Sequence, residues 1–304
     1  MRYRPTVRWV LPSAFALVLA TVNPSQIPAA GPEALPQPTS SLSAPETPAR
    51  SWAVDCANNE ALVIQHSDSF LRYRLHAIDE KGDRLRDQIE TPEGSVARLI
   101  KIDGRPLTPA EDAAERQRLN DLLASPASFT RHVSREQENR QMGVRLLKLM
   151  PDAMQWSYTP GQPQLPSQPP GDPAMVVLDF KADPAWSPPN FESEFLSGLE
   201  GRIWIDSRTR RMVRLQTDLV RPVNIGWGFV AHLYPGGSAT LQQANVGGQR
   251  WIVEHIVEQF DLRALLVKTV HEHMVYDTAD YQPVPAMSYQ QAIKILLDTP
   301  LPTR

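Results

Sequence analysis

Hydrophobic and polar residues alternate in short runs through most of the chain beyond residue 70. In the first run Leu71, Tyr73 and Leu75 share one face of an extended segment, and arginine and histidine share the other. Period-two patterning punctuated by Gly and Asp is typical of antiparallel strands joined by hairpins. Further strands are predicted at 85–89, 96–102, 154–158, 175–180, 202–206, 212–220, 228–234, 238–245, 250–260 and 265–276, with the last turn around residues 261–263.

A helical insert at residues 108–150 interrupts these strands. Thr108-Pro109-Ala110-Glu111 is a capping box with proline at the first helical position, in which the threonine and glutamate satisfy each other's backbone donors. This helix is predicted to run to about Ala124. Ser125-Pro126 then begins a second helix, which is predicted to end at Pro151.

Shorter helices are predicted at both ends of the strand region. One lies near residues 58–67, and the other begins at the Ser288–Gln291 capping box. Because strands and helices do not alternate, a doubly wound parallel sheet is excluded. The pattern predicts an α+β protein, mainly antiparallel β, whose curved sheet or incomplete β-barrel of about nine to eleven strands is covered by helices.

The N-terminus has the features of an export signal. Arg2, Arg4 and Arg8 precede the uncharged apolar run 9–20, which is shorter than the roughly 20 residues of a spanning helix. Residues 1–20 are therefore interpreted as a signal peptide with cleavage after Ala20 or later; an uncleaved anchor is the alternative. Seven prolines between residues 24 and 48 indicate a disordered linker over 21–51. A single domain over 52–304 follows.

Composition narrows the class of protein. The chain has 31 Lys+Arg and 34 Asp+Glu residues, a near-balance that excludes a general nucleic-acid binder. The single cysteine, Cys56, excludes an intrachain disulfide and a multi-cysteine metal site, and it lies too far downstream to be a lipidated first residue. We therefore expect a soluble protein of the periplasm or extracellular space, with no transmembrane segment in the mature chain and no cofactor.

The order of elements and one hairpin carry a family resemblance. Residues 201–215 contain a strand–Asp–x–x–Thr–x–x–strand pattern centred on Asp206 and Thr209. Together with the order helix, three strands, helical insert and long meander, this resembles the LolA/LolB-like group of periplasmic lipoprotein carriers and outer-membrane lipoprotein receptors. The resemblance implies a half-barrel whose apolar cavity holds acyl chains under helical lids. Since no lipid-accepting cysteine is present, it implies the soluble branch.

That resemblance points to a non-catalytic function and to cavity residues. It implies that the protein holds a lipid, a lipoprotein acyl chain or another apolar ligand. The large aromatic residues of the second half would then supply the lining, with Trp156, Trp204, Phe229 and Trp251 as the candidates. The alternative is that these side chains form ordinary core.

Three histidines offer a different chemistry. His271 and His273 lie on one face of a predicted strand, and His255 lies on the preceding strand. Three imidazoles could bind zinc with an open position for water, which would make the protein a metal-dependent hydrolase. The alternative is a polar outer face, because a one-residue slip in register would move His255 away. No GxSxG or P-loop motif is present.

Five arginines lie on the first three predicted strands. They could form a stripe for anionic head groups or an acidic partner, or else a solvated face balanced by nearby carboxylates. The residues are Arg72, Arg74, Arg84, Arg86 and Arg98. A stripe of this kind would suit a third hypothesis, a structural or interaction module of the cell envelope that holds a protein partner without a ligand.

Overall fold

The structure is a computed structural model that describes residues 47–65, 69–161, 175–227, 230–247, 250–264 and 267–302. The predicted signal peptide, residues 1–20, and most of the predicted linker lie outside the described residues. The first helix, α1 (Ala49–Gln65), begins earlier than the predicted 58–67 and includes three residues that were assigned to the linker. Trp52 and Cys56, which pack into the main core, explain the earlier start.

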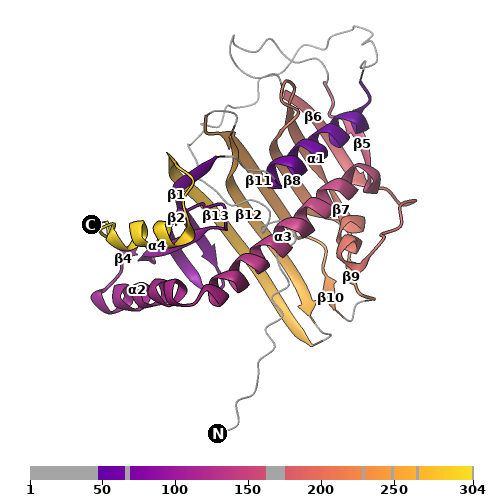
Figure 1. The fold of residues 1–304 in the computed structure, drawn as a ribbon. Helices are drawn as coiled ribbons and strands as arrows, with labels where there is room; N and C mark the ends of the chain where they lie inside the picture. The colour runs from indigo at the N-terminus through magenta and orange to yellow at the C-terminus, as the bar shows by residue number, and fades with distance from the viewer. Residues whose placement is uncertain are drawn as a thin grey trace, which may run out of the picture.

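The strands form one antiparallel sheet in the order β4-β3-β2-β1-β13-β12-β11-β8-β7-β6-β5, with β10 added to β12 and β9 to β10 (Figure 1). Their bounds are β1 (Phe70–Asp79), β2 (Gly82–Ile89), β3 (Val96–Ile102), β4 (Arg105–Pro106), β5 (Met154–Tyr158), β6 (Met175–Ala182), β7 (Leu199–Asp206), β8 (Met212–Leu219), β9 (Val223–Ile225), β10 (Ala231–Leu233), β11 (Ser238–Asn245), β12 (Trp251–Ala264) and β13 (Lys268–Val284). The sheet has 13 strands and does not close into a barrel, which confirms the predicted α+β class.

The strand count and one turn differ from the prediction. The very short strands β4 and β9 were not predicted. The expected turn at 261–263 is wrong, because β12 continues to Ala264 and pairs Asp261 with His271 of β13. Leu262 is buried in the main core, so burial keeps this segment extended where its polar neighbours suggested a turn.

Helices α2 (Pro109–Ala124) and α3 (Pro126–Ala153) form the predicted insert, and α4 (Tyr289–Asp298) and the 3-10 helix η1 (Phe191–Gly198) complete the set. The capping boxes are confirmed, since Thr108 accepts from the Glu111 N–H and Ser288 from the Gln291 N–H. α3 passes through Pro151 instead of ending there. Proline removes one backbone donor, and the helix still continues for two residues beyond it, to Ala153.

The helices pack on two regions of the sheet. α1 and α3 lie side by side across β5–β8 and β11, and α2 and α4 lie at the β1–β4 end (Figure 1). The main core is built on one rung of the sheet, by which we mean a row of residues paired directly across adjacent strands. The residues of this rung are all buried: Leu178, Ile203, Leu215, Leu241 and Ile256. Helix residues Trp52, Cys56, Leu146 and Met150 cover this face.

A second, smaller core fixes the β1–β4 end. Ile89 and Val96 of the sheet pack with Leu119 of α2 and Ile293 of α4. Phe129, near the start of α3, stacks on Tyr289 of α4 with ring centroids 3.7 Å apart. α3 therefore joins the two cores, since its first turns belong to the smaller and its last turns to the larger.

Candidate functional site

The Asp-x-x-Thr hairpin is a structural turn. Asp206 Oδ1 accepts hydrogen bonds from the N–H of Arg208 at 3.0 Å, the N–H of Thr209 at 2.7 Å and the hydroxyl of Thr209 at 2.9 Å. Arg210 follows with a φ of 54°, in the left-handed region. The pattern therefore specifies the conformation that reverses the chain between β7 and β8.

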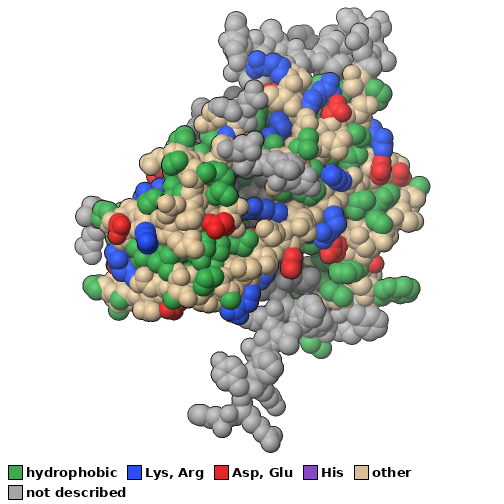
Figure 2. Space-filling view, in the orientation of Figure 1, with side chains coloured by type: hydrophobic (Ala, Val, Ile, Leu, Met, Phe, Trp, Pro, Cys, Tyr) green, Lys and Arg blue, Asp and Glu red, His purple; other side chains and the backbone are tan. Residues whose placement is uncertain are grey.

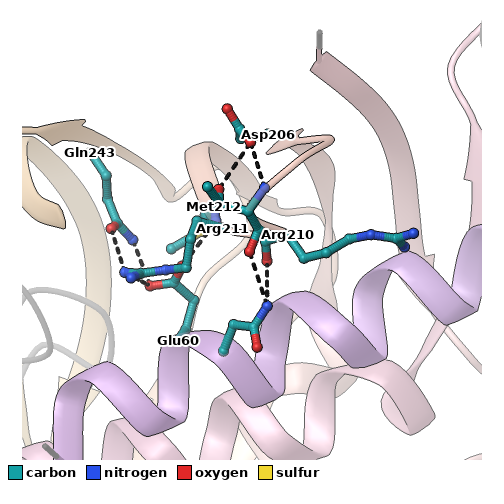
Figure 3. Close-up of polar contacts among 8 residues, drawn as sticks. Glu60, Asp206, Arg210, Arg211, Met212 and Gln243 are labelled. Carbon is teal, nitrogen blue, oxygen red and sulfur yellow. Dashed lines mark hydrogen bonds and ion pairs between the residues drawn. The ribbon is translucent and has the colours of Figure 1, made fainter. Parts of the chain in front are cut away.

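A buried ion pair fastens α1 to this hairpin (Figure 3). Glu60 accepts from Arg211 Nε at 2.6 Å, from Gln243 Nε2 at 2.9 Å and from the Met212 N–H at 2.9 Å. Glu60 is 1% exposed and Arg211 6%. These hydrogen bonds tie Glu60 of α1 to the start of β8 and to β11, so the network anchors the helix there.

The neighbouring rung of the helix-covered face contains polar groups of a different kind. Phe180, Gly201, Thr217, Ala239 and Glu258 follow one another across five strands in register. Glu258 is 0% exposed and Thr217 1% exposed. Neither Glu258 carboxyl oxygen has a hydrogen-bond partner among the residues that the structure describes, and the same is true of Thr217 Oγ1.

Ala239 lies between these two polar residues. Adjacent strands are about 4.8 Å apart, so the Thr217 and Glu258 backbones are separated by about 10 Å. Ala239 has the shortest side chain of the three and is itself buried in the main core. The three oxygens therefore share one stretch of an otherwise apolar face, where an unsatisfied polar group costs about 1–3 kcal/mol.

The surroundings disfavour the ionised form of Glu258. Burial raises its pKa well above the usual 4.5, and the negative charge of Glu272 raises that pKa further. Glu272 lies diagonally from Glu258 in the β12–β13 register, and Tyr276 lies at the other diagonal. The pKa of Tyr276 is raised by burial, then by Asp79, with a smaller contribution from Glu258.

The predicted cavity residues are not gathered together. Trp156 pairs with Phe180, so it extends onto β5 the row of paired residues that contains Glu258 (the Glu258 rung). Its ring packs on Phe180 with centroids 5.2 Å apart, and its indole N–H donates to the Pro151 carbonyl. Trp204 alternates with the buried Ile203 and Ile205, which places it on the opposite face of the sheet. There the guanidinium groups of Arg202 and Arg214 lie 5.9 and 5.1 Å from its ring centroid.

Trp251 lies near the anchor network, with the Arg211 guanidinium 5.7 Å from its ring centroid. Phe229 lies outside the described residues. The four aromatics were selected for their size, whereas the face that each one occupies depends on strand register. Register thus assigns Trp156 to the helix-covered face and Trp204 to the other.

The three histidines do not converge on one point. His255 pairs with Asp277 and its Nδ1 lies 2.7 Å from that carboxylate. His271 and His273 pair with Asp261 and Gln259, and Gln259 is four residues, or about 13 Å, along β12 from His255. Within the described ranges no group of three or more His, Cys, Asp or Glu side chains is placed to hold a metal ion. The predicted zinc site is therefore not assembled.

The five arginines do not form a stripe. Arg72 and Arg74 both pair with the buried Asp87 at 2.6 Å. Arg98 is itself buried and donates to the Leu296 carbonyl and Asp112. Arg84 pairs with Asp79, and Arg86 is largely buried, which lowers its pKa. Figure 2 also shows basic and acidic side chains interspersed on the face it presents.

A polar hollow of about 840 Å³ lies on the sheet face that α1 and α3 leave uncovered. Asp179 and Arg202 in its floor form an ion pair at 2.6 Å. The other side chains on this face are Gln155, Ser157, Lys181, Glu200, Gln216, Asp218, Ser238 and Thr240. Mixed, mutually paired charges of this kind are what an exposed face of a half-buried sheet carries.

Sequence reasoning missed Glu258 and Thr217, although a signal was present. Ile256, Glu258 and Phe260 share one parity in β12, so the strict alternation places the glutamate on the apolar face. Glutamate is almost never fully buried without a partner, and this preference conflicts with the pattern. The same holds for Thr217, which falls between Leu215 and Leu219 on the apolar face of β8.

Comparison with known proteins gives no match to a family model, a curated protein or a solved structure. None of the helices within the described ranges combines the length and hydropathy that crossing a bilayer requires. The functional proposals therefore rest on the residues and geometry of this chain.

Proposed function

We propose that the protein is an exported, non-catalytic binding protein that holds an amphiphilic ligand, such as a lipid or a lipoprotein acyl chain, on the helix-covered face of the open sheet. The observation that carries the proposal is the set of three buried oxygens of Glu258 and Thr217, which have no partner in the described part of the chain. A ligand with a polar group at this point would satisfy them.

The surrounding face suits the rest of such a molecule. Phe180 lies in the same rung as Glu258, and Ile203, Leu215, Leu241 and Ile256 form the adjacent rung of buried apolar side chains. Each methylene that a ligand buries there contributes about 0.8 kcal/mol, so an acyl chain supplies the affinity while the polar rung fixes its position. The anchored α1 and the neighbouring α3 would exclude water.

A matched pair of substitutions tests this function. Ala239→Leu fills the interval between Thr217 and Glu258, whereas Thr240→Leu adds a leucine to the same strand on the opposite face. Native mass spectrometry of protein purified from the exported fraction, followed by organic extraction, should find a co-purifying amphiphile in the wild type and in Thr240→Leu. Ala239→Leu should lose most of it while remaining folded by circular dichroism. A wild-type protein that carries no amphiphile and takes none up would contradict the proposal.

A second candidate function is an envelope interaction module that docks on a lipid bilayer. Trp227 is 91% exposed and Val267 is 86% exposed. Each lies in a turn that follows the last paired residues of its strand. Those last residues pair with one another across neighbouring strands, Ile225 with Ala231, Ala231 with Ala264 and Ala264 with Lys268, so both turns lie at the same end of the sheet (Figure 1). Turns are usually polar, whereas tryptophan favours the membrane–water interface.

Local charge agrees with an anionic surface. Arg263 and Lys268 flank the second turn, and segments 223–233 and 262–270 contain no Asp or Glu in their sequence. Glu194, which reaches the first turn from η1, accepts the Gly226 N–H at 2.7 Å. Each basic residue near an anionic bilayer contributes about 1 kcal/mol of attraction.

A further inference from the structure

We propose that the ligand's polar group is a primary ammonium, bound by Glu258 with the help of Thr217. This inference rests on the proposed binding function and narrows it to cationic amphiphiles. It also makes the site selective against fatty acids and other anionic amphiphiles of the same chain length.

The number and type of polar atoms match such a group. When Glu258 is deprotonated, Glu258 Oε1, Glu258 Oε2 and Thr217 Oγ1 are three acceptors that no described residue uses. A primary ammonium has three N–H donors and no acceptor. Glu258 and Thr217 approach from opposite sides of Ala239, so a compact head group held above that alanine could donate to both.

The charge around the site favours a cation. The charged group that acts most strongly on Glu258 is another carboxylate, Glu272 on β13. On the same face Arg211 is paired with Glu60, and Arg84 and Arg86 lie on β2, which is separated from β12 by β1 and β13. That is three strand spacings, or about 14 Å, and Arg84 is already paired with Asp79.

Binding of an alkylammonium ion by Glu258 changes the number of protons bound to the protein. A neutral, protonated Glu258 that receives an alkylammonium ion releases one proton to solvent, and the resulting carboxylate and the ammonium form a buried, hydrogen-bonded ion pair. A ligand that enters as the free amine takes the carboxyl proton instead, but it has already released one proton to solvent in leaving the ammonium form, so the net release is the same. A carboxylate ligand would bring a second negative charge beside Glu258 and Glu272, which low-dielectric surroundings penalise strongly.

Three probes with the same chain separate the head-group claim from the general binding function. Dodecylammonium, dodecanol and dodecanoate are titrated below their critical micelle concentrations into the full-length protein after removal of co-purified lipid. The structure predicts that dodecylammonium binds at least tenfold more tightly than dodecanol, and dodecanoate more weakly still. The Glu258→Gln substitution should weaken the affinity for dodecylammonium about tenfold or more. It should change the affinity for dodecanol by less than threefold.

Calorimetry at pH 6 in two buffers of different ionisation enthalpy adds a readout that a structural role would not move. Proton release on dodecylammonium binding should be detected for the wild type and for a Glu200→Gln control, and should be absent in Glu258→Gln. Equal affinity for amine and alcohol would overturn the ammonium assignment and leave the binding function intact. Failure of all three probes to bind would overturn the binding function itself.

Discussion

At the scale of single residues, two buried glutamates behave in opposite ways. Glu60 is surrounded by donors from Arg211, Gln243 and the Met212 backbone, and it forms an ion pair with Arg211. Glu258 is equally buried on the same sheet face but has another carboxylate as its charged neighbour. Burial alone therefore does not decide a carboxyl group's role; the partners that the fold brings to it do.

The raised pKa of Glu258 predicts a pH-dependent stability. Its folded pKa lies above the unfolded value of about 4.5, so stability is fully present below that value and declines as pH rises toward the folded pKa. The decline approaches 1.4 kcal/mol per pH unit within that window. Glu258→Gln, which stays neutral, should remove this slope and raise the melting temperature at pH 8 more than at pH 5.

Thermal unfolding of ligand-free protein between pH 4.5 and 8 measures the effect. Glu200→Gln is the control, because Glu200 is exposed on the opposite face of β7. Parallel curves for the wild type and Glu258→Gln over that range would show that the carboxyl is already ionised in the folded protein.

At the scale of elements, α1 is attached to the β7–β8 hairpin by two ion pairs of unequal burial. Glu60 and Arg211 are both buried, whereas Asp55 and Arg210 are partly exposed at 3.1 Å. Removing one partner of a buried pair leaves an uncompensated charge, but an exposed pair contributes little. α1 is therefore held on the β7–β8 hairpin mainly through Glu60.

Two alanine substitutions on the same helix test this difference. Glu60→Ala should lower the free energy of unfolding by about 3–5 kcal/mol, because it leaves the buried Arg211 charge without its ion-pair partner. Asp55→Ala should lower it by at most about 1 kcal/mol. Urea denaturation of both variants measures the two costs, and similar values would mean that the buried network does not anchor α1.

The elements themselves were largely predictable. The capping boxes at Thr108 and Ser288 depend on residues three positions apart, so they were correctly located from sequence. The turn expected at 261–263 was wrong because Leu262 is buried by contacts from distant strands and helices. Local chemistry fixes helix starts, but the length of a strand depends on what covers it.

At the scale of the whole molecule, the two turns that carry Trp227 and Val267 project from the same end of the sheet. Leaving a tryptophan in water forgoes the several kcal/mol that its burial would provide. If this end docks on a bilayer, full-length protein should float with vesicles that contain phosphatidylglycerol, and Trp227→Ser should reduce the bound fraction at least fivefold.

Ile295→Ser is the matched control, since Ile295 is also exposed but lies on α4 at the β1–β4 end. It should leave flotation unchanged. Arg263→Gln with Lys268→Gln should weaken binding and reduce its dependence on salt. Flotation that is equal in the wild type and Trp227→Ser, or absent in both, would rule out docking through these turns.

The sequence by itself determined the α+β class, the helical insert, the helix caps and the Asp206 turn. These features depend on the period of apolar residues and on hydrogen bonds between near neighbours, and both are set by residues close together in the sequence. Even the inward position of Glu258 was present in the alternation of β12, although its charge argued the other way.

Only the tertiary structure decided which distant residues meet. The β12–β13 register paired His255 with Asp277 and kept it away from His271 and His273, so a plausible zinc set was not assembled. Strand order across β8, β11 and β12 placed Thr217 and Glu258 on either side of Ala239. Each strand offers only two faces, but the partner across a sheet is set by pairing between segments far apart in the chain, which no local pattern encodes.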